Sequence, residues 1–250
     1  MCPMLSVNSA VPPNDPQASS TDFLERAFVW IGGALFAGSL TATVYVYAIG
    51  WSASRFGRPA LWPGLAANMA WFLAFALHHS LFARERIKGW VARHVPDRLL
   101  RSFYVWVASL LWFGVVAAWQ PLGGLVFEQT GTAARAAHAA VQVVGLLLIA
   151  ASVAAIDALE LAGIRSGSRP SGLQARGPYR LVRHPLYFGW MLAVFGAATM
   201  TFDRLVFAGV TTIYLIVAMP WEERSLERTF GGEYERYKQR VRWRMIPFVY

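Results

Sequence analysis

Long stretches without a charged residue constrain the fold of this chain more than any other feature. Five segments contain no Asp, Glu, Lys or Arg over about 18 residues or more, which is the length of a transmembrane helix. They are Ala27–Gly50, Pro59–Ala83, Ser102–Phe127, Ala136–Ile156 and Pro185–Phe202, and a sixth, Leu205–Trp221, is slightly shorter. Only 15% of the 250 residues are charged, against about 25% in soluble domains. The pattern predicts an all-α, polytopic integral membrane protein with about six helical spans; a soluble bundle of long buried helices is the alternative.

The distribution of positive charge predicts how these spans are oriented. The net charge is +9, and a basic chain can bind nucleic acid. Here, however, the Lys and Arg residues gather in 84–101, in 163–184 and after Glu223, always beside apolar segments. Short loops rich in Lys and Arg stay on the cytoplasmic side. We therefore expect no nucleic-acid partner, and a multi-pass protein of a bacterial inner membrane whose termini and basic loops face the cytoplasm.

The chain divides into three predicted regions. Residues 1–21 contain several prolines and no basic stretch before an apolar core, which predicts a disordered tail and not a signal peptide. Residues 22–160 hold four scaffold helices, and residues 161–250 form the region expected to carry function. Cys2 is the sole cysteine, so neither a disulfide framework nor a thiolate metal cluster is expected. No metal site is predicted.

The last region is predicted to form a helical hairpin followed by an amphipathic tail helix. Pro185 suits the first turn of a helix, and Thr201–Arg204 is the expected tip of the hairpin. Pro220 is expected to kink or end the returning helix. The tail helix is predicted over Glu222–Arg240, with a break at Gly231. Such a hairpin brings its first and last residues to the same membrane surface.

Charged residues of opposite sign lie at these two ends. Arg183, His184 and Tyr187 are spaced to share a helical edge, one turn after Tyr179. An Arg fork and a helix N-terminus both bind carboxylate, although an Arg at a helix end can simply extend toward the interface. Glu222-Glu223 could hold an ammonium group or ribose hydroxyls, or only mark the membrane boundary. Together the two edges suit a zwitterionic cofactor such as S-adenosylmethionine.

Two adjacent histidines lie within an apolar segment. His78 and His79 point about 100° apart on a helix, so they do not face one metal ion as a simple pair. A hydrogen-bonded structural histidine is the plainer interpretation, and no motif supports haem ligation. An ionisable residue inside a membrane is nevertheless a functional candidate. We expect His79 to be the catalytic base if the acceptor is a thiol.

Residues 172–248 resemble the C-terminal half of the membrane methyltransferases that include isoprenylcysteine carboxyl methyltransferase and the phospholipid N-methyltransferases. The matching pieces, in order, are Gly177-Pro178-Tyr179, Arg183-His184-Pro185, Tyr187, Gly189, Glu222-Glu223, Leu226, Phe230-Gly231, Tyr234, Tyr237, Val241, Arg242 and Pro247. The resemblance implies an S-adenosylmethionine-dependent membrane methyltransferase with Arg183 orienting cofactor or substrate. It also implies cofactor contacts at Leu173, Gln174, Tyr179, His184, Tyr187, Glu222 and Glu223.

The N-terminal half narrows the branch. His79–Arg84 and Arg101–Tyr104 resemble the subgroup that contains methanethiol S-methyltransferase and the NnrU proteins. The isoprenylcysteine enzymes are expected to carry a basic residue one turn before the paired glutamates, where this chain has Ala218. The expected reaction is therefore S-methylation of a small thiol such as methanethiol. Methylation of a prenylcysteine carboxylate or a lipid headgroup, an NADPH-dependent membrane reductase, and a non-enzymatic NnrU-like membrane protein remain as alternatives.

Overall fold

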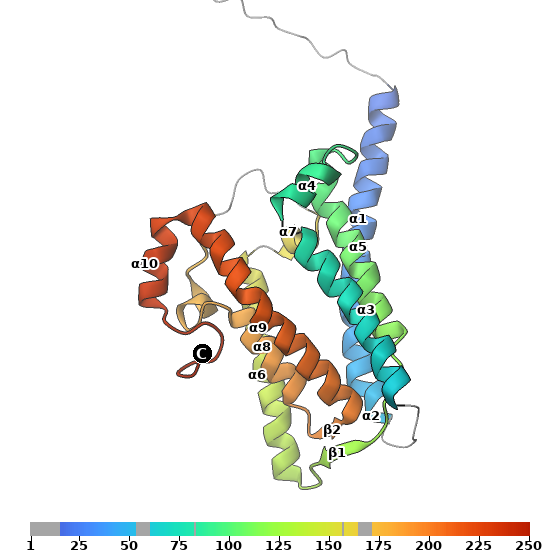
Figure 1. The fold of residues 1–250 in the computed structure, drawn as a ribbon, viewed down its shortest axis with the longest axis vertical. Helices are drawn as coiled ribbons and strands as arrows, with labels where there is room; N and C mark the ends of the chain where they lie inside the picture. The colour runs from blue at the N-terminus through green and yellow to red at the C-terminus, as the bar shows by residue number, and fades with distance from the viewer. Residues whose placement is uncertain (1–15, 54–60, 83, 157, 165–171) are drawn as a thin grey trace, which may run out of the picture.

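The structure is a computed structural model that describes residues 16–53, 61–82, 84–156, 158–164 and 172–250. The chain is almost entirely helical (Figure 1). The helices are α1 (Pro16–Tyr45), a π-helical turn η1 (Val46–Gly50), α2 (Trp51–Ala53), α3 (Leu61–Phe82), α4 (Glu85–Val91), α5 (Asp97–Ala117), α6 (Thr132–Ile156), α7 (Ala158–Leu161), the 3-10 turn η2 (Gly177–Arg180), α8 (Pro185–Phe195), α9 (Phe202–Phe230) and α10 (Gly232–Arg240). Strands β1 (Leu125–Glu128) and β2 (Thr199–Thr201) pair antiparallel.

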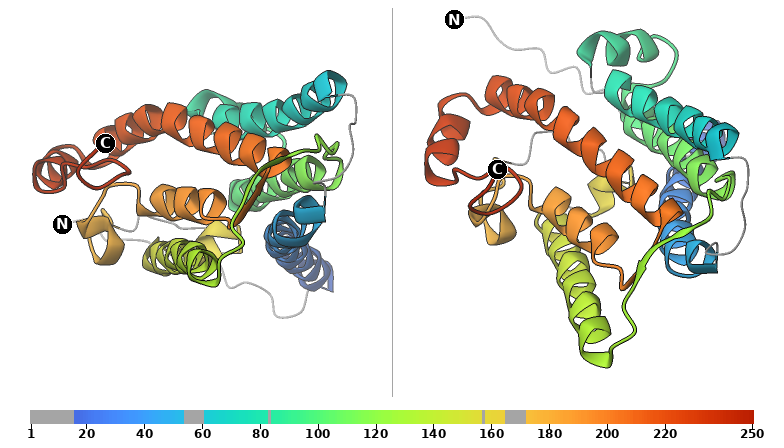
Figure 2. Two further views of the ribbon diagram at one scale, coloured as in Figure 1. Left: turned by 90° about the horizontal axis from the view of Figure 1, so that it is seen from below. Right: turned by 60° about the horizontal axis from the view of Figure 1, so that its bottom comes forward.

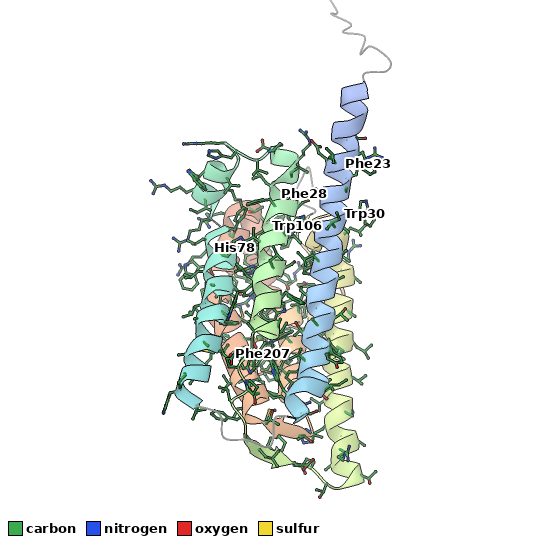
Figure 3. All side chains as sticks on the ribbon, turned by 90° about the vertical axis from the view of Figure 1, so that its right-hand side faces the viewer. Phe23, Phe28, Trp30, His78, Trp106 and Phe207 are labelled. Carbon is green, nitrogen blue, oxygen red and sulfur yellow. The ribbon has the colours of Figure 1, made fainter. Side chains whose placement is uncertain are left out.

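The apolar segments of the sequence form long helices, as predicted. Within the described residues, five helices are long and apolar enough to cross a membrane: Asp22–Gly50, α3, α5, α6 and α9. Their surfaces expose large apolar side chains such as Trp30 and Leu147, which are 61% and 63% exposed, and Figure 3 shows Trp30 and Phe23 projecting outward from α1. The fold is therefore that of a polytopic all-α membrane protein. The predicted tail, 1–21, overlaps the start of α1 at Pro16; residues 1–15 lie outside the described part of the chain.

The segment Pro185–Phe202 departs from a full helical span. Helix α8 has 11 residues and is about 16 Å long, half of the roughly 30 Å hydrocarbon core. It ends at Gly196, and the chain continues as the extended strand β2. Strand β2 pairs with β1, with Thr201 opposite Leu125 and Thr199 opposite Glu128. This pairing satisfies the extended backbone, which is the requirement that otherwise imposes a helix within a membrane.

The described helices form two groups, which meet along α9. In the first group α8 packs against α6 and α9, and in the second group α5 packs against α1 and α3. Figure 2 shows the two groups from below and from an oblique angle. At the lower end of Figure 1, where α2, β1 and β2 lie, Trp51, Trp119 and Phe207 form a buried aromatic core. The basic loop around α4 and the end of α9 lie toward the opposite end.

Two glycines allow the closest contact between helices in the first group. A Cβ on Gly189 of α8 would stand 2.7 Å from the carbonyl oxygen of Gly145, and one on Gly145 of α6 would stand 2.6 Å from that of Gly189. No real Cβ approaches a backbone oxygen so closely, so both positions require glycine while the helices keep this distance. The pair therefore sets how closely α6 and α8 approach each other.

The predicted hairpin tip, Thr201–Arg204, contains two buried charged residues, Asp203 and Arg204. Asp203 is 0% exposed and accepts hydrogen bonds from Trp119 Nε1 at 2.7 Å and from the backbone N–H of Leu122 at 2.8 Å. Arg204 donates to the carbonyl oxygens of Tyr47 at 2.9 Å and Ala48 at 2.8 Å, which lie at the π-helical turn η1. These two charges satisfy backbone groups that the irregular segments would otherwise leave unpaired.

Of the two outcomes predicted for Pro220, a kink or an end of the returning helix, the end was wrong. Helix α9 continues through Pro220 to Phe230, so Glu222 and Glu223 belong to α9 itself. The break at Gly231 is confirmed: this glycine has a positive φ of 50° and separates α9 from α10. Tyr234 and Tyr237 of α10 are buried against Val241, Leu226 and Leu173, which packs the tail back onto the helices.

Candidate functional site

An extended segment before α8 carries the first two candidate residues. The residue before a proline disfavours the helical conformation, and His184, which precedes Pro185, has φ −121°. The backbone N–H of Arg183 donates to Trp243 O at 2.9 Å, and that of His184 donates to Arg244 O at 2.7 Å. The predicted helical edge shared by Arg183, His184 and Tyr187 was therefore wrong, since only Tyr187 belongs to α8. The His184 and Tyr187 rings nevertheless stack, with centroids 5.2 Å apart.

The two charged edges meet, but they pair with each other. Arg183 Nε donates to Glu223 Oε1 at 2.7 Å, and both side chains are less than a tenth exposed. Arg183 Nη1 also donates to the carbonyl oxygens of Val241 at 2.9 Å and Arg242 at 2.8 Å. This guanidinium thus joins α9 to the segment that follows α10.

Glu223 is the centre of what we call the anchor network, formed by Arg183, His184, Glu223 and Arg244. His184 Nε2 lies 3.4 Å from Glu223 Oε1, and Arg244 Nε lies 3.2 Å from Oε2. Glu223 is only 4% exposed. A buried carboxylate is stable only when it is paired and hydrogen-bonded, and this network supplies both conditions.

Glu222 has a different environment from its neighbour. Its side chain is 46% exposed, and its Oε2 accepts a hydrogen bond from the Tyr187 hydroxyl at 2.6 Å. His184 Nδ1 lies 3.6 Å from the same oxygen. Glu222, Tyr187 and His184 form what we call the open polar face. A half-exposed carboxylate with one occupied oxygen can accept further hydrogen bonds from a ligand.

The other predicted cofactor residues, Tyr179, Gln174 and Leu173, belong to the segment that precedes α8. The carbonyl of Tyr179 accepts a hydrogen bond from the Tyr237 hydroxyl at 2.8 Å. Burial, reinforced by the Glu222 carboxylate, raises the pKa of the Tyr179 phenol, which therefore stays a neutral donor. Gln174 Nε2 donates to the carbonyl of Ala155 near the end of α6. Leu173 packs against the tail cluster of Tyr234, Tyr237 and Val241.

His79 lies on α3, apart from the anchor network. Its Nδ1 shares a hydrogen bond with the Tyr104 hydroxyl of α5, with a direction that depends on the imidazole tautomer. Its ring stacks on Phe75, with centroids 5.7 Å apart. His78, labelled on α3 in Figure 3, instead stacks on Tyr104 at 5.5 Å. Within the described chain neither ring nitrogen of His78 has a hydrogen-bond partner.

Sequence reasoning missed Tyr214, which connects the two parts of the site. The Tyr214 hydroxyl lies 3.2 Å from Ser80 Oγ, and its ring centroid is 6.1 Å from that of His79. Tyr214, Ala218 and Glu222 follow at four-residue intervals and so share one face of α9, about 12 Å from end to end. This four-residue spacing was the signal in the sequence that could have found it.

Arg244 was missed for a different reason. The residues after α10 carry no periodicity that predicts a partner, yet Arg244 reaches Glu223 from a segment that turns back on itself. The backbone N–H groups of Met245 and Ile246 donate to the carbonyl of Tyr250 at 2.8 and 2.9 Å. This closed C-terminal segment completes the anchor network.

The fold and site define an integral membrane protein with a polar site where α8 and α9 reach one end of the molecule. A model of the phospholipid methyltransferase family matches residues 137–233, a range that includes most of α6, all of α8 and α9, and the open polar face. The chain belongs to this superfamily of membrane methyltransferases and is itself a methyltransferase, as its relatives indicate.

Three relatives cover most of the chain. "Methanethiol S-methyltransferase" of Crocosphaera subtropica is 32% identical over 249 residues, 93% of this chain and 97% of the relative. "Methanethiol S-methyltransferase 2" of Bradyrhizobium diazoefficiens is 36% identical over 194 residues, 74% of each chain. Nurim of Homo sapiens is 30% identical over 198 residues, 71% of this chain and 73% of the relative. No solved structure matches. The methyltransferase relatives imply that a methyl donor binds.

Proposed function

We propose that this protein transfers a methyl group from S-adenosylmethionine to a small thiol such as methanethiol. The names of the methyltransferase relatives support the thiol, and the first of them matches the scaffold helices as well as the C-terminal region. The observation that carries the proposal is the continuous face of α9 that joins Glu222 to Tyr214. This face connects the open polar face with the polar side chains of α3 and α5.

The residues of the open polar face fit the chemistry of S-adenosylmethionine. The cofactor presents an ammonium group and a ribose diol, both hydrogen-bond donors, and the half-exposed carboxylate of Glu222 is an acceptor for such groups. The hydroxyl of Tyr187 and the ring of His184 border the same carboxylate. We assign cofactor binding to Glu222, Tyr187, His184 and Tyr179, with Gln174 and Leu173 at the margin nearest α6.

Glu223 and Arg183 have positioning roles in this proposal. Arg183 already donates to Glu223 and to two backbone carbonyls. Its guanidinium therefore orients the cofactor by holding α9 and the C-terminal segment in place, and not by binding the cofactor carboxylate through a free fork. Glu223 acts in the same way, because its two oxygens are occupied by the anchor network.

The reaction requires little from the protein beyond positioning and one proton transfer. When bound, S-adenosylmethionine supplies an electrophilic methyl group on a sulfonium. His79 would take the thiol proton, and the sulfur lone pair would accept the methyl group that bound S-adenosylmethionine supplies, with the demethylated, neutral thioether as the leaving group. His79 serves as base when its Nδ1–H donates to Tyr104, because Nε2 then carries the free lone pair.

The orientation follows from the basic residues around α4. Arg84, Arg86 and Arg93 are exposed there, at the end of the molecule toward which α9 also ends. Lys and Arg loops favour the cytoplasmic side. We infer that both termini and the cofactor site face the cytoplasm of a bacterial inner membrane, and that the acceptor arrives from the bilayer.

The test is a transfer assay with purified, detergent-solubilised protein and methyl-labelled S-adenosylmethionine. Methanethiol, a prenylated cysteine and phospholipids are offered separately as acceptors, with Glu222→Gln as the impaired variant and Glu233→Gln, an exposed acid of α10, as its control. Label in dimethyl sulfide supports the proposal. Label only in the prenylcysteine ester or in lipid would identify that molecule, and not the thiol, as the acceptor. Absence of label from every product would refute methyl transfer to these acceptors.

A further inference from the structure

Side chains of α3 and α9 meet along a seam between the two helix groups. Helix α3 packs mainly on α5, and α9 runs beside α3 in the ribbon views (Figures 1 and 2). The Tyr214 ring meets Phe72 edge-on with centroids 5.8 Å apart, and its hydroxyl lies 3.2 Å from Ser80 Oγ. Tyr214 thus makes two contacts with α3. The polar contact with Ser80 lies one turn or more beyond the aromatic contact with Phe72 along α3.

The side chains beside this bridge are polar although the surrounding helices are apolar. His79 and Tyr104 share a hydrogen bond next to it, and His79 and Ser80 are exposed and not packed into the core. Polar groups within a membrane are costly and usually serve a function. If the hydrogen bond between His79 and Tyr104 were purely structural, both side chains would be expected to lie buried between helices, where neither could meet a ligand.

The outer side of the seam is apolar. Ile213 and Val217, which flank Tyr214 on α9, are 62% and 52% exposed. A small neutral thiol partitions into lipid and can reach Tyr214 past these side chains without losing hydrogen bonds to water. A charged acceptor would have to leave its hydration shell on the same route, at a cost of several kcal/mol.

Helix α9 links the Tyr214 contact to the open polar face. Ala218 lies between Tyr214 and Glu222 on the same face of α9, is half-buried, and carries only a methyl group.

We propose that Ser80, Tyr214 and His79 form the acceptor site, in which the two hydroxyls hold the thiol sulfur beside His79 and the thiol enters from the bilayer between α3 and α9. Tyr104 is a positioning residue that fixes the His79 ring. This inference rests on the proposed function, because it assigns the acceptor of the same reaction. It adds residues on α3 and α9 that bind acceptor and leave cofactor binding unaffected.

The first test separates acceptor binding from cofactor binding. Loss of one hydrogen bond in Tyr214→Phe or Ser80→Ala should raise KM for methanethiol about 3- to 10-fold, with kcat and the calorimetric Kd for S-adenosylmethionine near wild type. Tyr45→Phe is the matched control for tyrosine, since Tyr45 is 61% exposed on α1. Ser109→Ala is the control for serine, because the Ser109 hydroxyl has no partner among the described residues. A KM shift equal to that of the controls overturns the acceptor site.

The second test needs no turnover. Cys2 is replaced by Ser, and Ala218→Cys supplies a single thiol on the face between Glu222 and Tyr214; its alkylation rate is measured with and without dimethyl sulfide. We expect dimethyl sulfide to slow alkylation, and Tyr214→Phe to weaken this protection while Tyr45→Phe preserves it. Alkylation that dimethyl sulfide never slows overturns the inference. A protected cysteine in a protein that methylates no thiol would instead refute the proposed function and keep the binding site.

Discussion

Arg183 and Glu223 are far apart in the sequence, yet their side chains form a buried ion pair in which Nε and Oε1 are 2.7 Å apart. Through the same guanidinium, α9 is tied to the carbonyls of Val241 and Arg242. The neighbouring acid, Glu222, is 46% exposed and bonded to Tyr187. Two adjacent residues of identical chemistry thus have separate tasks, one holding the tertiary structure and the other facing a ligand.

Glu223→Gln should destabilise the protein. Removing one partner from a buried ion pair leaves the other charge unpaired and costs about 3–5 kcal/mol, and Arg183 would be that charge. Thermal unfolding in detergent measures the loss, with Glu233→Gln as the exposed control. Equal melting temperatures for the variant, the control and wild type would show that the anchor network does not stabilise the fold.

Glu222→Gln should weaken cofactor binding and leave the fold intact. The side chain is half exposed, so its neutralisation strands no buried charge. A hydrogen bond to a charged group contributes about 1.5–3 kcal/mol, which corresponds to about 10- to 150-fold in affinity. Titration calorimetry with S-adenosylmethionine measures this change. An unaltered Kd would remove Glu222 from the cofactor site.

Gly189→Ala should separate α8 from α6. The new Cβ would lie 2.7 Å from Gly145 O and 3.0 Å from Ile149 N, and relieving such overpacking costs about 1–3 kcal/mol. Because α8 leads directly from His184, cofactor affinity should fall as well as stability. Gly209→Ala is the control, since its Cβ would meet no described atom within 4 Å. The two alanine variants behaving alike would contradict the close contact.

Asp203→Ala should destabilise the end of the molecule that contains β1 and β2. The change removes the acceptor for Trp119 Nε1 and for the N–H groups of Leu122 and Gly123. Each buried donor left unsatisfied costs about 1–3 kcal/mol. Unfolding in detergent should show a much smaller change for Asp22→Ala, whose side chain is 59% exposed. A stable Asp203→Ala protein would mean that these donors find other partners.

The proposed orientation can be tested with single cysteines in the Cys2→Ser background. Arg93 is exposed in the basic loop after α4, and Thr130 is exposed between β1 and α6. A membrane-impermeant maleimide added to intact cells should label Thr130→Cys but not Arg93→Cys. Asp203, although it lies between apolar segments, is unsuitable because it is buried. Labelling of Arg93→Cys alone would invert the orientation.

The sequence by itself determined the class of fold and much of the site. Uncharged segments of membrane length must form helices or paired strands, because lipid offers the backbone no hydrogen bonds, and this single constraint predicts the spans. The motifs around Arg183-His184-Pro185 and Glu222-Glu223 also predicted that distant segments come together. Tyr187 and Glu222 are in contact, as their places at the two ends of a hairpin suggest.

The tertiary structure decided how each polar residue is used. A charged residue in the sequence needs either an interaction partner or water. Only the packing of the folded chain shows which of the two it has. Glu223 is buried against Arg183, whereas Glu222 is half exposed. Asp203 accepts a hydrogen bond from a backbone N–H inside the protein, although its place in the sequence suggests a loop residue. Tyr214 lies beside His79 only because α9 crosses the seam next to α3. These relationships depend on distances between helices, which local patterns of residues do not encode.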